Sequence, residues 1–385
     1  MIKLLIFAMR FPPEHVGTAR YAAILASGLA ERGANVMVLA PNYAAEHPED
    51  RELSYAVRRI RRGQHRFVPL RYLVARNALK RALSEFQPDV LWATNGMAVR
   101  VAGSMESQLQ VPLIGNLNGT DMATRLPGRT PRTWIESVPQ RRFYKGADRL
   151  CTISRFTYDL ALSKGLDSDK IQVLYPSVEL PDDLKGKRRK ASTQHPELAD
   201  RRIVLTVGRL VKQKGHRNLL EAMRQVAVTH PDVLHIIVGD GPERKALAEQ
   251  VKQLGLSNNV RLVGYITEEE LESYYALATV FALTSHEVNF YVEGLGLVFI
   301  EAAARGLVAV GSRHGGIPEA IADGETGFLV DPHQPEEIGR KLCSLFDDDQ
   351  LRVRMGAAAQ RHAAERFSLT GMMDKCCDML QEVTA

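Results

Sequence analysis

The stretch VEGLGLVFIEAAARG, residues 292–306, sets two carboxylates, Glu293 and Glu301, at either end of an apolar run that Gly294 and Gly296 interrupt. A strand pattern, VFALTS, precedes the stretch, and another, LVAVGS, begins directly after it. The apolar run between them has the length and spacing of a helix. This succession of strand, loop, helix and strand is typical of a parallel sheet whose crossovers are helices.

The same alternation extends outward over both halves of the chain. The strand candidates of the first half are IKLLIFAM, NVMVLA, DVLWAT, PLIGNLN, RLCTIS and IQVLY, and those of the second half are RIVLTVG, LHIIVGDG, VRLVGYI, VFALTS, LVAVGS and GFLVD. Between them, residues 181–202 are polar and contain two prolines and a basic cluster, which is typical of an interdomain linker. We therefore expect an α/β fold of two doubly wound Rossmann-like domains, residues 1–180 and 203–366. The last segment, 367–385, is predicted to form a helix that packs back onto the first domain.

Open parallel sheets bind ligands beyond the carboxyl ends of their strands, so two facing sheets would form an interdomain cleft that holds the functional site. The helix is predicted over Leu297–Arg305, with Glu293 in the loop before it and Glu301 one turn inside it. Glycines there let backbone amides approach an anion at the positive end of the helix, while carboxylates accept hydrogen bonds from vicinal hydroxyls. A polyhydroxyl ligand that carries phosphate fits this pattern. The alternative is a solvated Glu293 and a Glu301 that only stabilises its helix.

A second candidate cluster follows the strand RIVLTVG. Arg209, Lys214 and Gly215 stand before a helix that is predicted to begin near His216. Two cations, a glycine turn and a helix amino terminus form a suitable environment for a pyrophosphate. Cations after strands are also common on protein surfaces, so a solvated loop is the alternative.

The net charge of +5 is unevenly distributed. Residues 1–180 contain 25 Lys and Arg against 16 Asp and Glu, whereas the rest of the chain contains 25 against 29. From Arg58 to Arg81, nine basic residues follow one another without an acid, and apolar and aromatic residues are interleaved with them. This segment indicates a basic amphipathic face for an anionic lipid surface. A solvated arginine-rich helix and loop is the alternative.

Other classes of protein are disfavoured. No apolar run approaches the ~20 residues of a membrane span, and an intracellular protein is expected. The four cysteines, Cys151, Cys343, Cys376 and Cys377, lack the spacing of a zinc site or a disulfide framework. An aromatic content of 6% and the absence of a recognition motif argue against nucleic-acid binding. No GxGxxG follows the first strand of either half, which disfavours an oxidoreductase.

A longer segment, VEGLGLVFIEAAARGLVAVGSRHGGIPEAIADGETGFLVDP, resembles the donor-binding half of family 4 of the retaining glycosyltransferases. These enzymes have the GT-B architecture of two facing Rossmann-like domains. The Glu-x7-Glu motif of the family matches at Glu293 and Glu301, and VGRLVKQKG matches its donor-phosphate segment. VGDGPERKAL and VRLVGYITEEEL also occupy their expected places. The resemblance covers nearly the whole chain and is strongest from Ile203 to Pro332.

The resemblance implies a role for each matching residue. Arg209 and Lys214 would hold the pyrophosphate of the donor and stabilise the nucleoside diphosphate as it leaves, without a metal ion. Glu301 would accept the ribose hydroxyls, and Glu293 would hold the transferred sugar. Backbone groups would complete the donor site at Gly294, Leu295, Gly296 and Leu297 for the sugar and phosphate, and at Tyr265 and Ile266 for the base.

The first domain departs from the pattern of the family. A single Gly17 stands where paired glycines are common, and it remains a candidate for close approach to the donor phosphate or the acceptor. In LNGTD, Asn118 occupies the place of a frequent histidine, and an amide cannot relay a proton at neutral pH. Asn118 and Asp121 are therefore expected to position the acceptor, and a donor phosphate oxygen would take the proton. His15 is a substitute base, with a surface histidine as its alternative.

The function implied is that of a retaining, metal-independent hexosyltransferase that needs no cofactor. It would move a hexose from GDP-mannose or a UDP-sugar to a hydroxyl of a lipid-linked or glycan acceptor. The expected location is cytoplasmic and peripheral on the inner face of the cytoplasmic membrane, with the Arg58–Arg81 segment on the anionic surface and no nucleic acid as partner. The alternative is a catalytically weak protein that binds a nucleotide-sugar.

Overall fold

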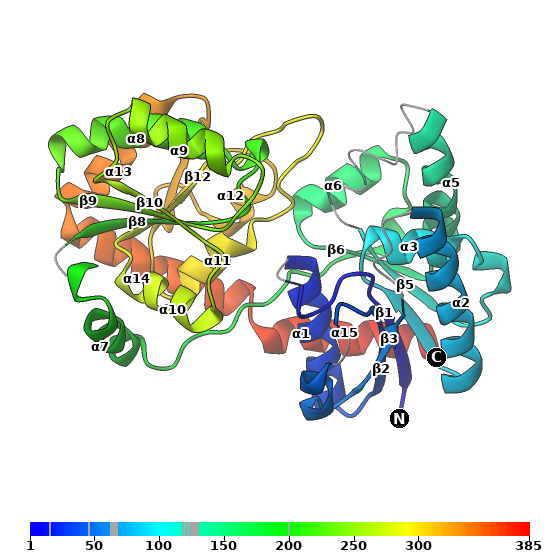
Figure 1. Ribbon diagram of the computed structural model, residues 1–385. Helices are drawn as coiled ribbons and strands as arrows, with labels where there is room; N and C mark the ends of the chain where they lie inside the picture. The colour runs from blue at the N-terminus through cyan, green and yellow to red at the C-terminus, as the bar shows by residue number, and fades with distance from the viewer. Residues whose placement is uncertain are drawn as a thin grey trace. The chain divides into compact units, whose positions relative to one another are not determined.

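The computed structural model describes residues 1–14, 17–44, 47–61, 68–117, 119, 122, 131–198 and 201–385. These residues form two compact units. Unit 1 combines Met1–Ser177 with Leu369–Ala385, and unit 2 is Val178–Ser368. Each unit is built on a parallel sheet with helices on both faces (Figure 1). The expected α/β fold with two doubly wound sheets is confirmed.

Unit 1 contains a seven-stranded sheet in the order β3-β2-β1-β4-β5-β6-β7. All of its strand pairs are parallel. Its strands are β1 (Lys3–Phe7), β2 (Asn35–Pro41), β3 (Ala56–Ile60), β4 (Val90–Ala93), β5 (Leu113–Leu117), β6 (Arg149–Thr152) and β7 (Ile171–Val173). Its helices are α1 (Gly17–Glu31), α2 (Val68–Phe86), α3 (Gly96–Gly103), α5 (Pro131–Gly146), α6 (Arg155–Ser163) and α15 (Leu369–Thr384).

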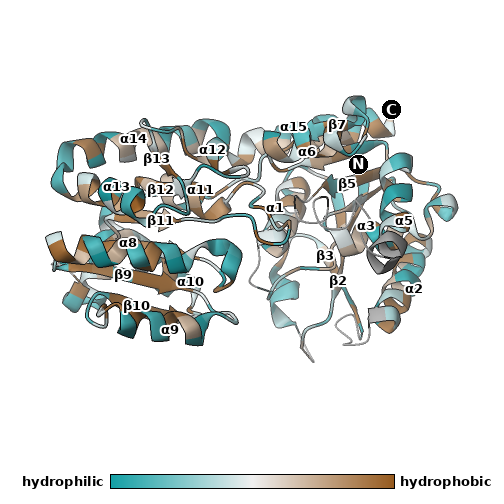
Figure 2. Ribbon diagram, turned by 90° about the horizontal axis from the view of Figure 1, so that it is seen from above, coloured by the Kyte–Doolittle hydropathy of each residue, from teal (hydrophilic) through white to brown (hydrophobic). Residues whose placement is uncertain are grey.

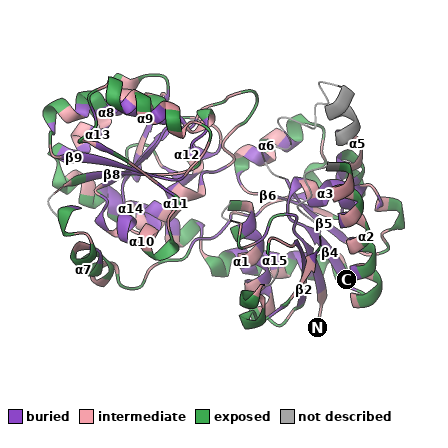
Figure 3. Cartoon of the chain, viewed as in Figure 1, coloured by how far each residue is buried: buried purple, intermediate pink, exposed green. Residues whose placement is uncertain are grey.

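Alternation along β1 divides the core of unit 1 into two layers. Leu4 and Ile6 join a cluster with α1 and α15, and Leu5 and Phe7 join a second cluster with α2, α3 and α5. Successive side chains of a strand point to opposite faces, so an uninterrupted apolar strand must be covered on both sides. Figure 3 shows the resulting pattern of buried strands and exposed outer helix faces.

The carboxyl-terminal helix α15 belongs to the core of unit 1. A Cβ added to Gly28 of α1 would lie 2.4 Å from the sulfur of Met373 of α15, so the glycine permits close contact between the two helices. The Sγ atom of Cys151 in β6 lies 3.5 Å from the Sδ atom of Met379. Met373, Cys376 and Met379 are fully or almost fully buried, and apolar burial of this extent stabilises the packing of α15.

Unit 2 contains a six-stranded parallel sheet in the order β10-β9-β8-β11-β12-β13. Its strands are β8 (Arg202–Val207), β9 (Val233–Val238), β10 (Val260–Gly264), β11 (Val280–Leu283), β12 (Ala309–Ser312) and β13 (Gly327–Val330). Its helices are α7 (Leu184–Gln194), α8 (His216–Thr229), α9 (Arg244–Gln253), α10 (Glu268–Leu277), α11 (Leu297–Ala304), α12 (Ile317–Ala320), α13 (Pro335–Asp347) and α14 (Asp349–Arg366). Figure 1 shows α8, α9 and α13 on one face of the sheet and α10, α11 and α14 on the other. The apolar colour in Figure 2 is concentrated on strands such as β9 and β10.

Two segments differ from the sequence-based reading. Residues 56–60, at the start of the arginine-rich run, form the edge strand β3, which pairs with β2. Their sequence, AVRRI, is too short and too basic to read as a strand, but an edge strand needs only one paired neighbour. The expected linker, 181–202, contains helix α7, which packs against α10 within unit 2 through stacked rings of His195 and Tyr274 with centroids 5.5 Å apart.

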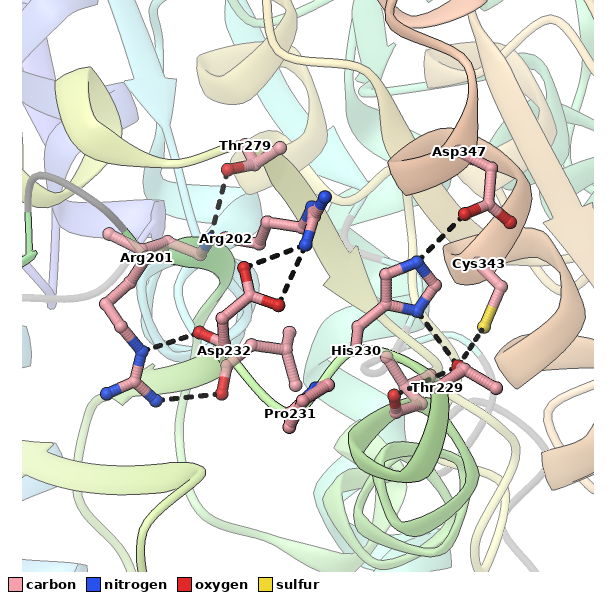
Figure 4. A network of polar contacts seen from close by, with 12 residues as sticks. Arg201, Arg202, Thr229, His230, Pro231, Asp232, Thr279, Cys343 and Asp347 are labelled. Atoms are coloured by element: carbon pink, nitrogen blue, oxygen red, sulfur yellow. Dashed lines mark hydrogen bonds and ion pairs between the residues drawn. The ribbon is translucent and has the colours of Figure 1, made fainter.

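The amino-terminal edge of the unit 2 sheet is held by polar contacts (Figure 4). Asp232 accepts two hydrogen bonds of 2.8 Å from the Arg202 guanidinium, and its carbonyl accepts one from Arg201. At the end of α8, His230 is bound on one ring nitrogen to Asp347 and on the other to Thr229, both at 2.9 Å. These contacts join α8, β8, β9 and α13 at the edge opposite to the predicted donor residues.

Candidate functional site

The carboxyl edge of the unit 2 sheet brings together the donor residues predicted for this unit. Arg209 and Lys214 follow β8, Tyr265 and Ile266 follow β10, and residues 293–297 follow β11. β8 and β11 are neighbours, and the chain leaves them toward opposite sides of the sheet. The site therefore lies where neighbouring crossovers diverge, as expected for an open α/β sheet.

Lys214 and Glu293 form the central ion pair of the site. The Lys214 Nζ atom lies 2.5 Å from Glu293 Oε2, and the two side chains are only 21% and 19% exposed. The Ser285 hydroxyl donates to the same carboxylate oxygen at 3.2 Å. From the sequence, Lys214 was predicted to bind the donor phosphate and Glu293 to bind the sugar. In the structure, the two side chains bind each other directly.

Glu293 is held as an anion. Burial alone raises the pKa of its carboxyl group, but the charge of Lys214 and the hydrogen bonds from Lys214 and Ser285 outweigh burial and lower the pKa below its ordinary value. An ionised carboxylate accepts hydrogen bonds on both oxygens and donates none. Glu293 is therefore suited to bind hydroxyl groups.

Gly296 forms the turn between Glu293 and α11. Its φ of 83° lies in the left-handed region, and a Cβ at this position would lie 2.7 Å from the ring of Phe299. In the described part of the chain, no side chain caps the start of α11. The Phe299 amide bonds back to the Gly296 carbonyl at 2.9 Å. The dipole of α11 favours an anion at this end.

A second glycine loop, Gly315–Gly316, packs against the backbone of Glu293 and Gly294. The Gly316 amide donates to the Glu293 carbonyl at 3.0 Å. Gly315 has a φ of 60°, and a Cβ there would lie 2.2 Å from that carbonyl oxygen. A Cβ on Gly316 would lie 2.1 Å from the Gly294 carbonyl oxygen. No role for this loop was predicted from the sequence, although adjacent glycines after the strand LVAVGS are a signal for close backbone approach.

Arg209 lies on the surface at the end of β8, and no carboxylate is paired with its guanidinium among the residues that the structure describes. Its backbone is fixed by His216, whose Nε2 lies 3.0 Å from the Arg209 carbonyl oxygen. Burial lowers the pKa of His216 to about 4, so its ring is neutral at pH 7 and donates this bond from Nε2. The backbone is thus anchored while the charged side chain is exposed to solvent.

Glu301 and the predicted base contacts complete this edge. Glu301 accepts a hydrogen bond of 3.1 Å from the hydroxyl group of Tyr275. This contact was not predicted from the sequence, because the pattern around Tyr275 is that of a core residue of α10. Tyr265 is 68% exposed directly after β10, and Ile266 beside it is half-buried. An exposed aromatic ring such as that of Tyr265 can stack against a planar base.

A cationic pocket of about 450 Å³ borders the site next to α8. Lys212, Arg217, His286 and His333 contribute its charged and titratable side chains, and the two histidine rings meet edge to face with centroids 4.9 Å apart. Burial, together with the charges of His333 and His314, lowers the pKa of His286. The pocket extends the positive character of this part of unit 2.

Of the site residues predicted in unit 1, the structure describes only Gly17. Gly17 is exposed and begins α1, after the end of β1. Asn118, Asp121 and His15 lie outside the described residues, and their roles stay predictions.

The basic segment is only partly available to a ligand. Arg59 makes a two-pronged pair with Asp50 at 2.6 and 2.8 Å, and Arg58 pairs with Glu85. Lys80 and Arg81 on α2 are exposed, as is Leu73, 54% of whose surface is accessible. Arg62 and Arg66 of this run lie outside the described residues. No helix in the described part of the chain has the length and apolarity needed to cross a bilayer.

Two doubly wound units, one of which holds a carboxylate, cations and a helix amino terminus at its sheet edge, are typical of nucleotide-binding α/β proteins. Residues 16–177 match the family described as glycosyl transferase 4-like domain, and residues 187–362 match the one described as glycosyl transferases group 1. The chain belongs to the group 1 glycosyltransferases, and the expected family is confirmed.

Two curated relatives illustrate this membership. A D-inositol 3-phosphate glycosyltransferase of Corynebacterium glutamicum is 31% identical over 288 residues, which are 71% of this chain and 68% of the relative. A GDP-mannose-dependent alpha-(1-6)-phosphatidylinositol monomannoside mannosyltransferase of Mycolicibacterium smegmatis is 27% identical over 374 residues, 94% of either chain.

Solved structures agree on the fold. Anabaena HepE in complex with UDP-glucose has a TM-score of 0.81 at 21% identity, over 99% of this chain and 100% of that chain. A sucrose-phosphate synthase from Thermosynechococcus elongatus has a TM-score of 0.82 at 20% identity, over 100% and 99%. These likenesses establish the GT-B fold for this chain.

Proposed function

We propose that this glycosyltransferase moves mannose from GDP-mannose to a hydroxyl group of an inositol-containing phospholipid, with retention of the anomeric configuration and without a metal ion. The observation that carries the proposal is the buried Lys214–Glu293 pair beside Arg209 and the uncapped start of α11. The activities of the relatives from Corynebacterium and Mycolicibacterium support mannose as the sugar and inositol phosphate or its lipids as acceptors.

The charges of the site match the charge that develops during transfer. Breaking the bond between the anomeric carbon and phosphate leaves negative charge on the diphosphate and oxocarbenium character on the sugar. Arg209, Lys214 and the amides of residues 294–297 would stabilise the diphosphate, and the ionised Glu293 would bind hydroxyls of the mannose. Glu301 would bind the ribose, and the backbone at Tyr265 and Ile266 would contact the base.

Retention requires attack from the face that the diphosphate leaves. In the proposed mechanism, an oxygen of the leaving diphosphate accepts the proton of the acceptor hydroxyl as the new bond forms. Asn118 and Asp121 of unit 1 would orient that hydroxyl, and Gly17 would admit the donor phosphate or the acceptor. In the proposed site, Arg209, Lys214 and the positive end of α11 would together stabilise the diphosphate in place of a divalent ion.

Donor and mechanism are tested together. Thermal shift with GDP, UDP and ADP identifies the nucleotide, and transfer from labelled GDP-mannose to phosphatidylinositol vesicles measures activity. We expect stabilisation by GDP, a product with the anomeric configuration of the donor by NMR, and a rate unaffected by EDTA. Binding of GDP-mannose without turnover would instead return the chain to the alternative of a weak nucleotide-sugar binder. Inversion, or loss of activity in EDTA, would refute the mechanism.

We also propose that α2 binds an anionic membrane surface, peripheral on the cytoplasmic face, through Leu73, Lys80 and Arg81. Each basic residue near such a surface contributes about 1 kcal/mol, so Lys80→Gln with Arg81→Gln should weaken binding to anionic vesicles about 30-fold. The matched control is Lys245→Gln with Lys252→Gln, two exposed lysines of α9 in unit 2. Equal effects of the two pairs in a co-sedimentation assay would show that only net charge matters and would remove α2 as the membrane face.

A further inference from the structure

Tyr275 lies behind Glu301, the residue that the proposed function assigns to the ribose. The tyrosine is 2% exposed, and its hydroxyl group donates to Glu301 Oε2 at 3.1 Å. It comes from α10, whereas Glu301 comes from α11, and both helices cover the same face of the sheet (Figure 1). A carboxylate offers about four acceptor positions, so it can accept the bond from Tyr275 together with bonds from other donors.

The ring of Tyr275 is fixed from two sides. The Arg305 guanidinium carbon lies 4.6 Å from its ring centroid, and the Phe281 ring is stacked at 6.3 Å with an interplanar angle of 19°. A buried ring in contact with a cation and a second ring has one orientation open to it. The position of its hydroxyl oxygen is therefore set by packing before any ligand binds.

Arg305 follows Glu301 by four residues, a spacing at which an arginine commonly pairs with a carboxylate on the same helix. Here its side chain instead donates to the Glu301 backbone carbonyl at 2.8 Å and forms an ion pair with Glu272. Glu272 is also bound by Lys187 of α7 at 3.1 Å. A guanidinium fork on the Glu301 carboxylate would occupy both oxygens, and Glu272 holds that fork away.

We infer that Tyr275 is a positioning residue that orients the Glu301 carboxylate toward the ribose hydroxyls and thereby sets the preference of the enzyme for ribonucleotide donors. The inference rests on the proposed function, because it requires Glu301 to bind ribose. A neutral hydroxyl donor suits this task, since it fixes the carboxylate plane without cancelling the charge that attracts the vicinal hydroxyls.

The test compares binding of GDP and 2′,3′-dideoxy-GDP by isothermal titration calorimetry. Wild type should prefer GDP, and Tyr275→Phe should reduce the ratio of the two affinities about five- to tenfold, mainly through weaker GDP binding. The matched control is Tyr274→Phe, a neighbouring tyrosine of α10 that is 8% exposed and stacks on His195. This control should leave the ratio unchanged, and in a Glu301→Gln background Tyr275→Phe should have no further effect.

Thermal unfolding of each variant separates a structural role from a positioning role. Loss of Tm in Tyr275→Phe with an unchanged affinity ratio would overturn the inference and leave Tyr275 as a packing residue. A wild type that binds both nucleotides equally would remove the assignment of Glu301 to ribose, and the inference with it. Absence of GDP binding by wild type would be a failure of the proposed donor itself, which the thermal-shift screen detects separately.

Discussion

Each unit has an ion pair at the carboxyl end of its sheet, but Arg10 and Glu14 share the loop after β1, whereas Lys214 follows β8 and Glu293 follows β11. In unit 2, Lys214 and Glu293 are about four-fifths buried, and Glu293 is bound by Ser285 through its side chain and by Gly316 through its backbone. In unit 1, Arg10 pairs with Glu14 after β1, and the two side chains are 51% and 24% exposed. A pair with one solvent-exposed partner contributes less to stability and to fixed geometry than a pair in which both partners are buried.

The difference indicates that the charged residues of unit 2 are held in a more rigid arrangement than those of unit 1. A diphosphate and a sugar ring are common to all nucleotide-sugar donors, and a site for them can be built rigidly from backbone, glycines and a buried ion pair. An acceptor varies between enzymes, and the Arg10–Glu14 pair of unit 1 is more exposed than the Lys214–Glu293 pair of unit 2. We therefore expect substitutions in unit 2 to affect catalysis more than substitutions in unit 1.

The largest expected effect is that of Lys214→Ala. Loss of a preorganised cation at the leaving diphosphate should lower kcat about 10²- to 10³-fold. The matched control is Lys212→Ala, an exposed lysine of the same short 3₁₀ turn, which should retain most of the activity. Because Lys214→Ala leaves Glu293 partly buried and unpaired, the double variant with Glu293→Gln should recover Tm without recovering activity. Substantial activity in Lys214→Ala would show that the buried ion pair of unit 2 is not essential for catalysis, and would refute the contrast drawn between the two units.

Acid should destabilise unit 2 through its buried histidines. Burial lowers the pKa of His216 to about 4 and that of His235 to about 3, both below the usual value of 6.5. The unfolded chain therefore binds protons that the folded chain does not, and stability falls as the pH drops from 6.5 to 4. His216 alone accounts for up to about 3 kcal/mol of this loss. His216→Gln should flatten the dependence, whereas exposed His333→Gln should not.

The two tryptophans allow this effect to be assigned to a unit, because both Trp92 and Trp134 lie in unit 1. Tryptophan emission therefore reports on unit 1, and far-ultraviolet circular dichroism reports on both units. Between pH 6.5 and 4 in mild denaturant, we expect the dichroism to change before the emission. Emission that changes first, or a pH profile that is identical in His216→Gln, would contradict the assignment.

The smallest expected effect is that of Asn118→Ala in unit 1. An amide that only positions the acceptor hydroxyl contributes one neutral hydrogen bond, so kcat/KM should fall by at most about tenfold. Steady-state kinetics with varied acceptor at saturating GDP-mannose measures this loss. A decrease as large as that of Lys214→Ala would show that unit 1 contributes an equally preorganised catalytic group.

The sequence was sufficient for the sheets and the motifs of unit 2 because both are local. Strands such as VFALTS are buried on both faces and read as apolar runs, and Glu293, Gly296 and Glu301 have a fixed spacing along one loop and helix. The edge strand β3 was missed because it carries two arginines among five residues. The run of basic residues predicted a set of unpaired positive charges. Arg59, however, forms an ion pair with Asp50, nine residues earlier in the sequence.

Contacts between distant segments could not be predicted. Ser285, Gly316 and Tyr275 reach Glu293 or Glu301 only through the packing of neighbouring crossovers. The local sequence around each residue is common in proteins and does not indicate a function. Ser285 is a small polar residue after a strand, Gly316 is a glycine in a turn, and Tyr275 is an aromatic residue on a buried helix face. Their roles depend on which loops the sheet order β8-β11-β12 brings together, and that order is a property of the tertiary structure.

The place of α15 has a practical consequence for dissecting the protein. The chain leaves unit 1 after Ser177 and returns at Leu369, so unit 2 is an insertion within unit 1 and not its successor. Removal of the last 17 residues would strip the apolar cover from α1 and damage the amino-terminal half, although the deletion is made at the opposite terminus. Residues 178–368 are the natural fragment for expressing unit 2 alone, whereas unit 1 requires a short bridge from 177 to 369.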